Sequence, residues 1–301
     1  SVLFNGIRYV EPGMIKQVVS RLFSLVFVED WARRPKLVGL FVTLSLTEVR
    51  EVLEAPFTME EVWRVVKESN GYKAPGPDGF NMACVQKCWQ VMKKDIFQFL
   101  QEFHSNGRLV KGLNSSFIAL IPKVVSPSSL VDFRPISLLN LAYKILSIVL
   151  SRRLSLVLPK IISEVQSAFI GGHHIFDGIM IANEVIDWWK KHKKKGLILK
   201  LDFEKAFDSV NWEFLWSMLT NFGFGELWVR WMKECVTTAR ISILVNGSLS
   251  DEFSPCKGLR QGDPLSPILF NIVVEGLNLL LARAKDLGLL KGISVGHSEI
   301  Q

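Results

Sequence analysis

Residues 199–208 read LKLDFEKAFD, and this stretch decides how the fold is interpreted. It overlaps an apolar, strand-like run over residues 196–201, and Asp202 stands where that run ends. A carboxylate at the end of a strand can face a cleft, and Mg²⁺ prefers such hard oxygen ligands on a rigid element. The stretch therefore predicts a strand followed by a candidate metal ligand. The alternative for Asp202 is a carboxylate that caps the next turn.

A second informative string, GLRQGDPLSP, covers residues 258–267 and leads into a predicted helix. Gly262 allows the backbone to approach a ligand, and the N-terminus of a helix favours phosphate oxygens. Pro264 suits a helix start because its missing N–H costs little there. Gln261 and Gly262 are therefore candidate nucleotide contacts. The alternative, a generic turn into a helix, does not explain the whole string.

Two cations flank a short loop between predicted extended segments at 116–121 and 132–136. Arg134 offers a bidentate fork for phosphate, and Lys123 offers a point charge. A loop held between extended segments can fold over phosphates, so both residues are candidates for binding a phosphate chain. The alternative is two solvated side chains.

Phe207 follows Asp202 by five residues. Core packing is the ordinary role of a phenylalanine, whereas a ring that faces a nucleotide sugar excludes a 2′-OH sterically. Glu204 and Asp208 lie in the same stretch. With Lys205 they form the charge pattern of a solvated or capping face, so both are predicted to lie outside the site.

Composition gives bounds on the class of protein. The chain has 301 residues, 49% of them hydrophobic and 22% charged, which is typical of a globular protein. A net charge of +7 suits a polyanionic partner. The four cysteines lack zinc-ribbon spacing and are predicted to be buried thiols. No uninterrupted apolar run reaches the roughly 18 residues that a membrane span needs.

Local signals place the motifs on helices and strands. A capping box at residues 58–61, a left-handed stop at Gly223 and an Asn246-Gly247 hairpin turn are the clearest. Helices are predicted at 58–66, 82–104, 139–158 and 212–222, around Trp228 and Trp231, and at 264–281. The pattern favours an α+β fold in which helices cover one face of an antiparallel sheet.

Together, residues 199–208 and 258–267 resemble motifs A and B of the reverse transcriptases of LINE-type (non-LTR) retrotransposons, most closely those of plant elements. Further strings resemble the same family in the same order. Residues 73–80 resemble a loop at the start of the fingers, 117–123 and 133–138 resemble fingers motifs 1 and 2, and 166–170 resemble the segment before the palm. His173-His174 departs from the Arg-Gln usual in the family.

The resemblance implies a right-hand polymerase with fingers and a partial palm, an RRM-like antiparallel sheet backed by helices, and no thumb. It divides the chain into a linker after an absent endonuclease domain (1–46), fingers (47–170) and palm (171–301). The chain is expected to end a few residues before motif C, which supplies further metal carboxylates. On that expectation the fragment is inactive.

The resemblance also assigns roles to residues. Asp202 becomes the catalytic metal aspartate, with the backbone carbonyl of Phe203 beside it on Mg²⁺. Lys123 and Arg134 grip the incoming triphosphate, and Phe207 is the steric gate against ribonucleotides. Gln261 and Gly262 contact the nucleotide and the template.

The implied function is RNA-directed DNA polymerisation by two-metal nucleotidyl transfer. The partners are then an RNA template, a DNA primer and deoxynucleoside triphosphates, with no membrane, in the cytoplasm and nucleus. Two alternatives stay open: a degenerate, non-catalytic nucleic-acid-binding remnant and a maturase-like splicing factor.

Overall fold

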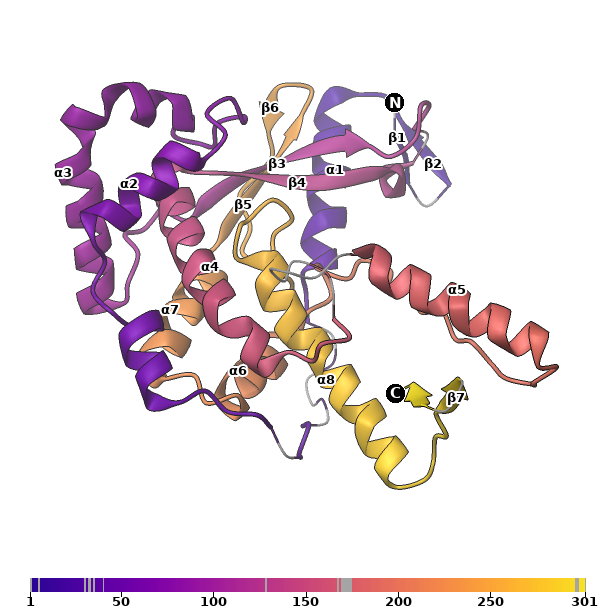
Figure 1. Cartoon of the computed structure of the whole chain (residues 1–301). Coiled ribbons are helices and arrows are strands. Elements are labelled where there is room, and N and C mark those ends of the chain that lie inside the picture. The colour runs from indigo at the N-terminus through magenta and orange to yellow at the C-terminus, as the bar shows by residue number, and fades with distance from the viewer. Residues whose placement is uncertain are drawn as a thin grey trace.

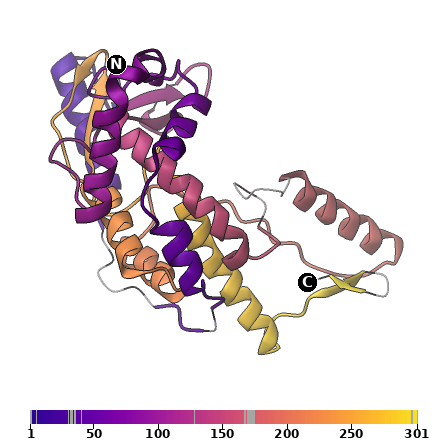
Figure 2. The same cartoon turned by 60° about the vertical axis from the view of Figure 1, so that its left-hand side comes forward.

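A computed structural model describes residues 2–4, 6–29, 31, 34, 36–39, 41–127, 129–166, 168, 175–295 and 298–300. The architecture is a mixed α+β fold in which helices pack beside a small sheet (Figure 1). Helix α5 extends away from this body in both views (Figure 2). His173 and His174 lie outside the described residues.

The helices are α1 (Pro12–Val26), α2 (Met59–Glu68), α3 (Met82–Asn106), α4 (Leu141–Ile161), α5 (Ile175–Lys191), α6 (Trp212–Asn221), α7 (Glu226–Thr237) and α8 (Ser266–Asp286), with a π-helical turn at Glu48–Leu53 and a 3₁₀ turn at Leu130–Asp132. The strands are β1 (Val2–Phe4), β2 (Ile7–Tyr9), β3 (Ser115–Pro122), β4 (Phe133–Leu139), β5 (Arg240–Val245), β6 (Ser248–Leu249), β7 (Ile293–Val295) and β8 (Ser298–Ile300). All predicted helices are present, with small shifts at their ends. Thr58 caps α2 by accepting from the Glu61 N–H at 3.1 Å.

The central sheet has the strand order β4-β3-β5-β6. β3 pairs with β4 in antiparallel register, placing Ile121 opposite Arg134. β3 pairs with β5 in parallel, so the prediction of an antiparallel sheet is wrong for this pair. The chain leaves β4 through several helices before it returns as β5, and such a crossover allows a parallel neighbour. The predicted hairpin joins β5 to β6, with Asn246 and Gly247 both at positive φ.

The predicted strand at residues 196–201 is also absent. This segment has no regular secondary structure, and Leu197 and Leu199 are 86% and 73% exposed. A strand needs a neighbour that supplies hydrogen-bond partners, and the segment pairs with none of the described strands. The prediction of a strand is therefore wrong, because an apolar run forms a strand only where a neighbouring strand pairs with it.

Two apolar clusters hold the fold together. The larger one joins α2, α3, α4, α6, α7 and α8 and includes the fully buried Trp228 and Trp231. The smaller one joins α1 to the sheet, with Val19 and Phe23 in the same cluster as Ile118 and Ile243. Part of the segment predicted as a linker thus packs on the sheet. The domain boundaries at 46 and 170 stay a prediction.

The loop at residues 73–79 is fixed on the start of α4. The Asp78 carboxylate accepts from the Leu141 N–H at 2.6 Å, and the Asn140 side chain accepts from the Asp78 N–H at 2.9 Å. A Cβ at Gly76 would lie 2.2 Å from the carbonyl carbon of Leu139. A glycine is therefore required for this close approach.

One prediction from composition needs correction, that of four buried cysteines. Cys235 is buried, but Cys88 and Cys256 are exposed, because they lie outside the apolar face of α3 and in a surface loop. By length and composition α8 is apolar enough to cross a membrane. Its first turns are part of the larger cluster, where Leu269 and Ile272 are fully buried.

Candidate nucleotide site

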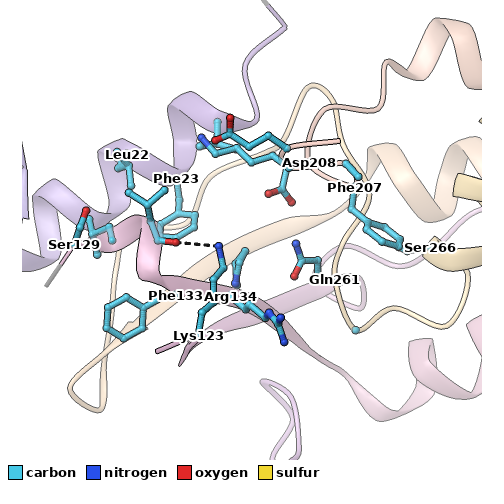
Figure 3. A pocket seen from close by; sticks show the side chains of 18 of the residues that line it. Leu22, Phe23, Lys123, Ser129, Phe133, Arg134, Phe207, Asp208, Gln261 and Ser266 are labelled. Atoms are coloured by element: carbon cyan, nitrogen blue, oxygen red, sulfur yellow. Dashed lines mark hydrogen bonds between the residues drawn. The ribbon is translucent and has the colours of Figure 1, made fainter. Parts of the chain in front are cut away.

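A cavity of about 680 Å³ opens at the edge of the sheet, between the β3–β4 connection, α1 and two turns of the chain (Figure 3). Its lining includes every residue predicted to contact the nucleotide: Lys123, Arg134, Phe207, Gln261 and Gly262. These residues come from three segments that are far apart in the sequence. The structure thus brings these residues to one cavity, and their roles as a nucleotide site stay predictions.

The sheet places the two predicted cations. Lys123 follows β3 directly, and its N–H donates to the Asp132 carbonyl at 2.7 Å. Its ammonium group donates to the backbone carbonyl of Val131 at 2.9 Å (Figure 3). Arg134 lies at the start of β4, opposite Ile121. Both side chains are solvent-exposed and are therefore able to reach a ligand in the cavity.

The turn that carries Gln261 and Gly262 is anchored on both sides by buried charges. Arg260 and Asp263 form an ion pair at 2.8 Å, and the Tyr143 hydroxyl donates to Asp263 at 2.8 Å. The Arg260 guanidinium lies over the Tyr143 ring at 4.6 Å. Burial raises the pKa of Tyr143 well above its usual value, so its hydroxyl remains a donor.

Gly262 brings this turn against β4. Its φ is +99°, and a Cβ there would lie 2.9 Å from the Ser137 carbonyl oxygen. The Ser137 N–H in turn donates to the Gln261 carbonyl at 2.7 Å. A residue without a side chain is thus needed at position 262, because the motif B turn and β4 approach each other closely there. This approach places Gln261 at the cavity.

Phe207 is half-buried and joins the cavity to the core. Its ring stacks on Phe270 with centroids 4.9 Å apart, and its carbonyl accepts from the Leu259 N–H at 2.8 Å. The ring therefore has a packing role, and its role as a steric gate stays a prediction. It packs on α8, and it forms part of the cavity wall.

The predicted metal residues do not line this cavity. Asp202 is exposed, and Phe203 lines a second cavity of about 400 Å³ beside α6 and α8. Among the described residues, no three His, Cys, Asp or Glu side chains are grouped to hold a metal ion. Both residues follow directly after the segment at 196–201 that forms no strand.

Sequence reasoning placed Glu204 and Asp208 outside the site, but both line the cavity. Asp208 is the more deeply buried of the two. It was predicted to lie on a solvated or capping face, but it is only 6% exposed and lines the cavity. Burial raises its pKa to about 6, although Lys205 and Lys123 act in the opposite direction. The sequence feature that could have predicted its burial is its position between the apolar residues Phe207 and Val210, the second of which is buried.

Comparison with known proteins identifies the family. The sequence profile of "Reverse transcriptase (RNA-dependent DNA polymerase)" matches residues 121–291. The uncharacterised 149 kDa protein of transposon TX1 from Xenopus laevis is 31% identical over 93% of this chain. The Pol polyprotein of the type-2 retrotransposable element R2DM from Drosophila melanogaster is 28% identical over 75% of it.

The chain spans about a fifth of the length of these relatives, 22% in both cases. The family profile nevertheless covers more than half of the chain, including both segments of the cavity that carry Phe207 and Gln261. The chain therefore belongs to the reverse transcriptase (RNA-dependent DNA polymerase) family, and it has homologues in non-LTR retrotransposons.

Proposed function

We propose that this chain is the reverse transcriptase domain of a LINE-type polyprotein and takes part in RNA-directed DNA polymerisation. The observation that carries the proposal is the single cavity formed by residues from fingers motifs 1 and 2, motif A and motif B. Its charged lining includes Lys123, Arg134 and Lys205, which suits a triphosphate. Within this proposal, residues 47–170 are fingers and 171–301 are palm.

The proposed role of each residue follows from the chemistry of its side chain and from its place in the cavity lining. Lys123 and Arg134 hold the triphosphate, since both cations reach the cavity from the sheet edge. Gln261 and Gly262 contact the base pair formed by nucleotide and template. Phe207 faces the sugar, supported from behind by Phe270.

Mg²⁺ is the proposed cofactor, with Asp202 and the carbonyl of Phe203 as ligands. An exposed carboxylate just before the turn at 204–209 is a hard oxygen donor, and Mg²⁺ is usually held by one or two carboxylates together with substrate phosphates. These donors therefore fit the ion. When bound, it would neutralise charge on the reacting phosphate.

The proposed partners are an RNA template, a DNA primer and deoxynucleoside triphosphates, with the cytoplasm and nucleus as location. The net charge of +7 supports polyanionic partners. A plant origin is supported by an uncharacterised mitochondrial protein of Arabidopsis thaliana, which is 46% identical over 55 residues.

Removing the charge of either cavity cation tests the proposal. Lys123→Gln and Arg134→Gln are each expected to weaken equilibrium binding of a deoxynucleoside triphosphate roughly tenfold or more, because a hydrogen bond to a charged group contributes about 1.5–3 kcal/mol. Lys111→Gln is the matched control, because Lys111 is exposed and does not line the cavity. Equal affinities for all three variants would contradict the assignment of the triphosphate site.

Phe207→Ala is expected to admit ribonucleotides in a longer polypeptide of the same element. Loss of the ring opens space for the 2′-OH, and steric discrimination of this size is worth roughly 10–200-fold. The measurement is the ratio of kcat/KM for a ribonucleotide and the matching deoxynucleotide. Phe270→Ala is the control, because it removes the stacking partner but leaves the ring at the cavity. An unchanged ratio in an active Phe207→Ala protein would assign Phe207 to the core alone.

A further inference from the structure

We propose that Asp208 binds the triphosphate in its protonated form, so that triphosphate binding is coupled to the uptake of one proton by this carboxylate. The proposal rests on the proposed function, because it takes the cavity as the triphosphate site. It assigns a ligand-binding role to a residue that the sequence motifs left outside the site.

The position of Asp208 is the first observation. The residue lies in the turn at 204–209, is 6% exposed and lines the cavity wall. Figure 3 shows its carboxylate pointing into the cavity, towards the ends of Lys123 and Gln261. A ligand that spans these two residues therefore passes directly by the carboxylate.

The second observation is that no described residue donates a hydrogen bond to this carboxylate, although the residue is only 6% exposed and the nearby charges are those of Lys205 and Lys123. Its backbone is held in place. A Cβ on Gly258 would lie 2.7 Å from the Asp208 carbonyl oxygen, and the Gly258 N–H donates to Val210 at 2.7 Å. The backbone that carries this side chain is thus held against the turn at Gly258.

The third observation is that both charged and apolar residues line the cavity around the carboxylate. The charged groups that line the cavity are Lys123 after β3, Arg134 on β4, and Glu204 and Lys205 in the turn of Asp208 itself. Helix α1 contributes only apolar side chains, and the motif B turn contributes uncharged ones. The cations lower the pKa of Asp208, but burial outweighs them and raises it to about 6.

The protonation state of Asp208 determines how it interacts with a phosphate oxygen. An ionised carboxylate is an acceptor only and repels an anionic oxygen, whereas the protonated acid donates one O–H to it. A triphosphate adds negative charge beside the group, which favours the protonated form further. The proton comes from solvent and is released when the ligand leaves.

The sign of the pH dependence follows. Below pH 6 the free protein already holds the proton, so affinity there is insensitive to this group. As pH rises above 6, the free protein loses the proton and binding must restore it. Affinity then falls by up to about tenfold per pH unit, until the group also ionises in the complex.

The experiment measures the dissociation constants of a deoxynucleoside triphosphate and of inorganic tripolyphosphate from pH 5.5 to 8.5. It uses the 301-residue chain and its Asp208→Asn and Asp208→Leu variants at fixed free Mg²⁺. The Asn amide is a permanently neutral donor, and Leu is neutral without a donor. Ligand protonation is common to all three proteins and cancels in their ratios.

We expect Asp208→Asn to bind as well as the unchanged chain at pH 5.5 and roughly tenfold better at pH 8. Asp208→Leu should bind more weakly than Asp208→Asn throughout. Calorimetry in buffers of different ionisation enthalpy should show proton uptake by the unchanged chain near pH 7 that exceeds the ligand's own contribution. This last measurement needs no variant.

Two outcomes would overturn the assignment of Asp208 alone: a pH-independent ratio between the chain and Asp208→Asn, or weaker binding by Asp208→Asn at pH 8. The second outcome would show that the carboxylate is used in its ionised form. Absence of any triphosphate binding by the unchanged chain would instead refute the proposed function, and the role of Asp208 with it.

Discussion

Asp202→Asn is expected to abolish Mg²⁺-dependent primer extension on an RNA template while nucleic-acid binding stays nearly unchanged. The variant loses a charged metal ligand, and metal stabilisation of a reacting phosphate is worth several kcal/mol, or roughly a thousandfold in rate. Binding depends on the basic surface, which the substitution leaves intact. Steady-state extension by a longer polypeptide of the same element, paired with a filter-binding titration, measures both quantities.

The structure makes this variant unusually easy to interpret. Asp202 is exposed in a segment without regular secondary structure, so the substitution removes no packing. Asp251→Asn, an exposed carboxylate after β6, serves as the matched control. Near-normal extension by Asp202→Asn would remove the residue from the metal site. Joint loss of extension and binding would assign it a structural role.

The sequence predicted what local chemistry determines. Caps, left-handed glycines and hairpin turns act over a few residues, and for that reason Thr58, Gly223 and Asn246 were placed correctly. The cations, Phe207 and Gln261 line one cavity, and only the resemblance had linked these distant segments, because no local pattern contains a long-range arrangement.

The wrong predictions of strand pairing and burial all concern contacts between residues that are distant in the sequence. Whether residues 196–201 form a strand depends on a neighbouring edge, and the parallel pairing of β5 depends on the path through four helices. The close approach of Gly258 to the Asp208 backbone joins two segments about 50 residues apart. The charge pattern of one segment does not predict whether residues from another segment bury its side chains.

Asp263→Ala is expected to destabilise the chain by about 3–5 kcal/mol, because it leaves the buried Arg260 without its carboxylate partner. The substitution also removes the acceptor of the Tyr143 hydroxyl and the acceptor of the Leu265 N–H at the start of α8. Urea denaturation measures the loss. Glu60→Ala is the control, since it breaks an exposed ion pair with Arg64 and should cost less than about 0.5 kcal/mol.

A double variant separates the charge from the packing at this turn. Arg260→Met with Asp263→Ala should be more stable than Asp263→Ala alone, because no uncompensated charge is then buried. A double variant that is no more stable than Asp263→Ala, or a single variant no worse than Glu60→Ala, would contradict this account. The expected order of stabilities, with the double variant above Asp263→Ala, implies that the ion pair fixes one conformation of the turn. That conformation keeps Gly262 against Ser137 and Gln261 at the cavity.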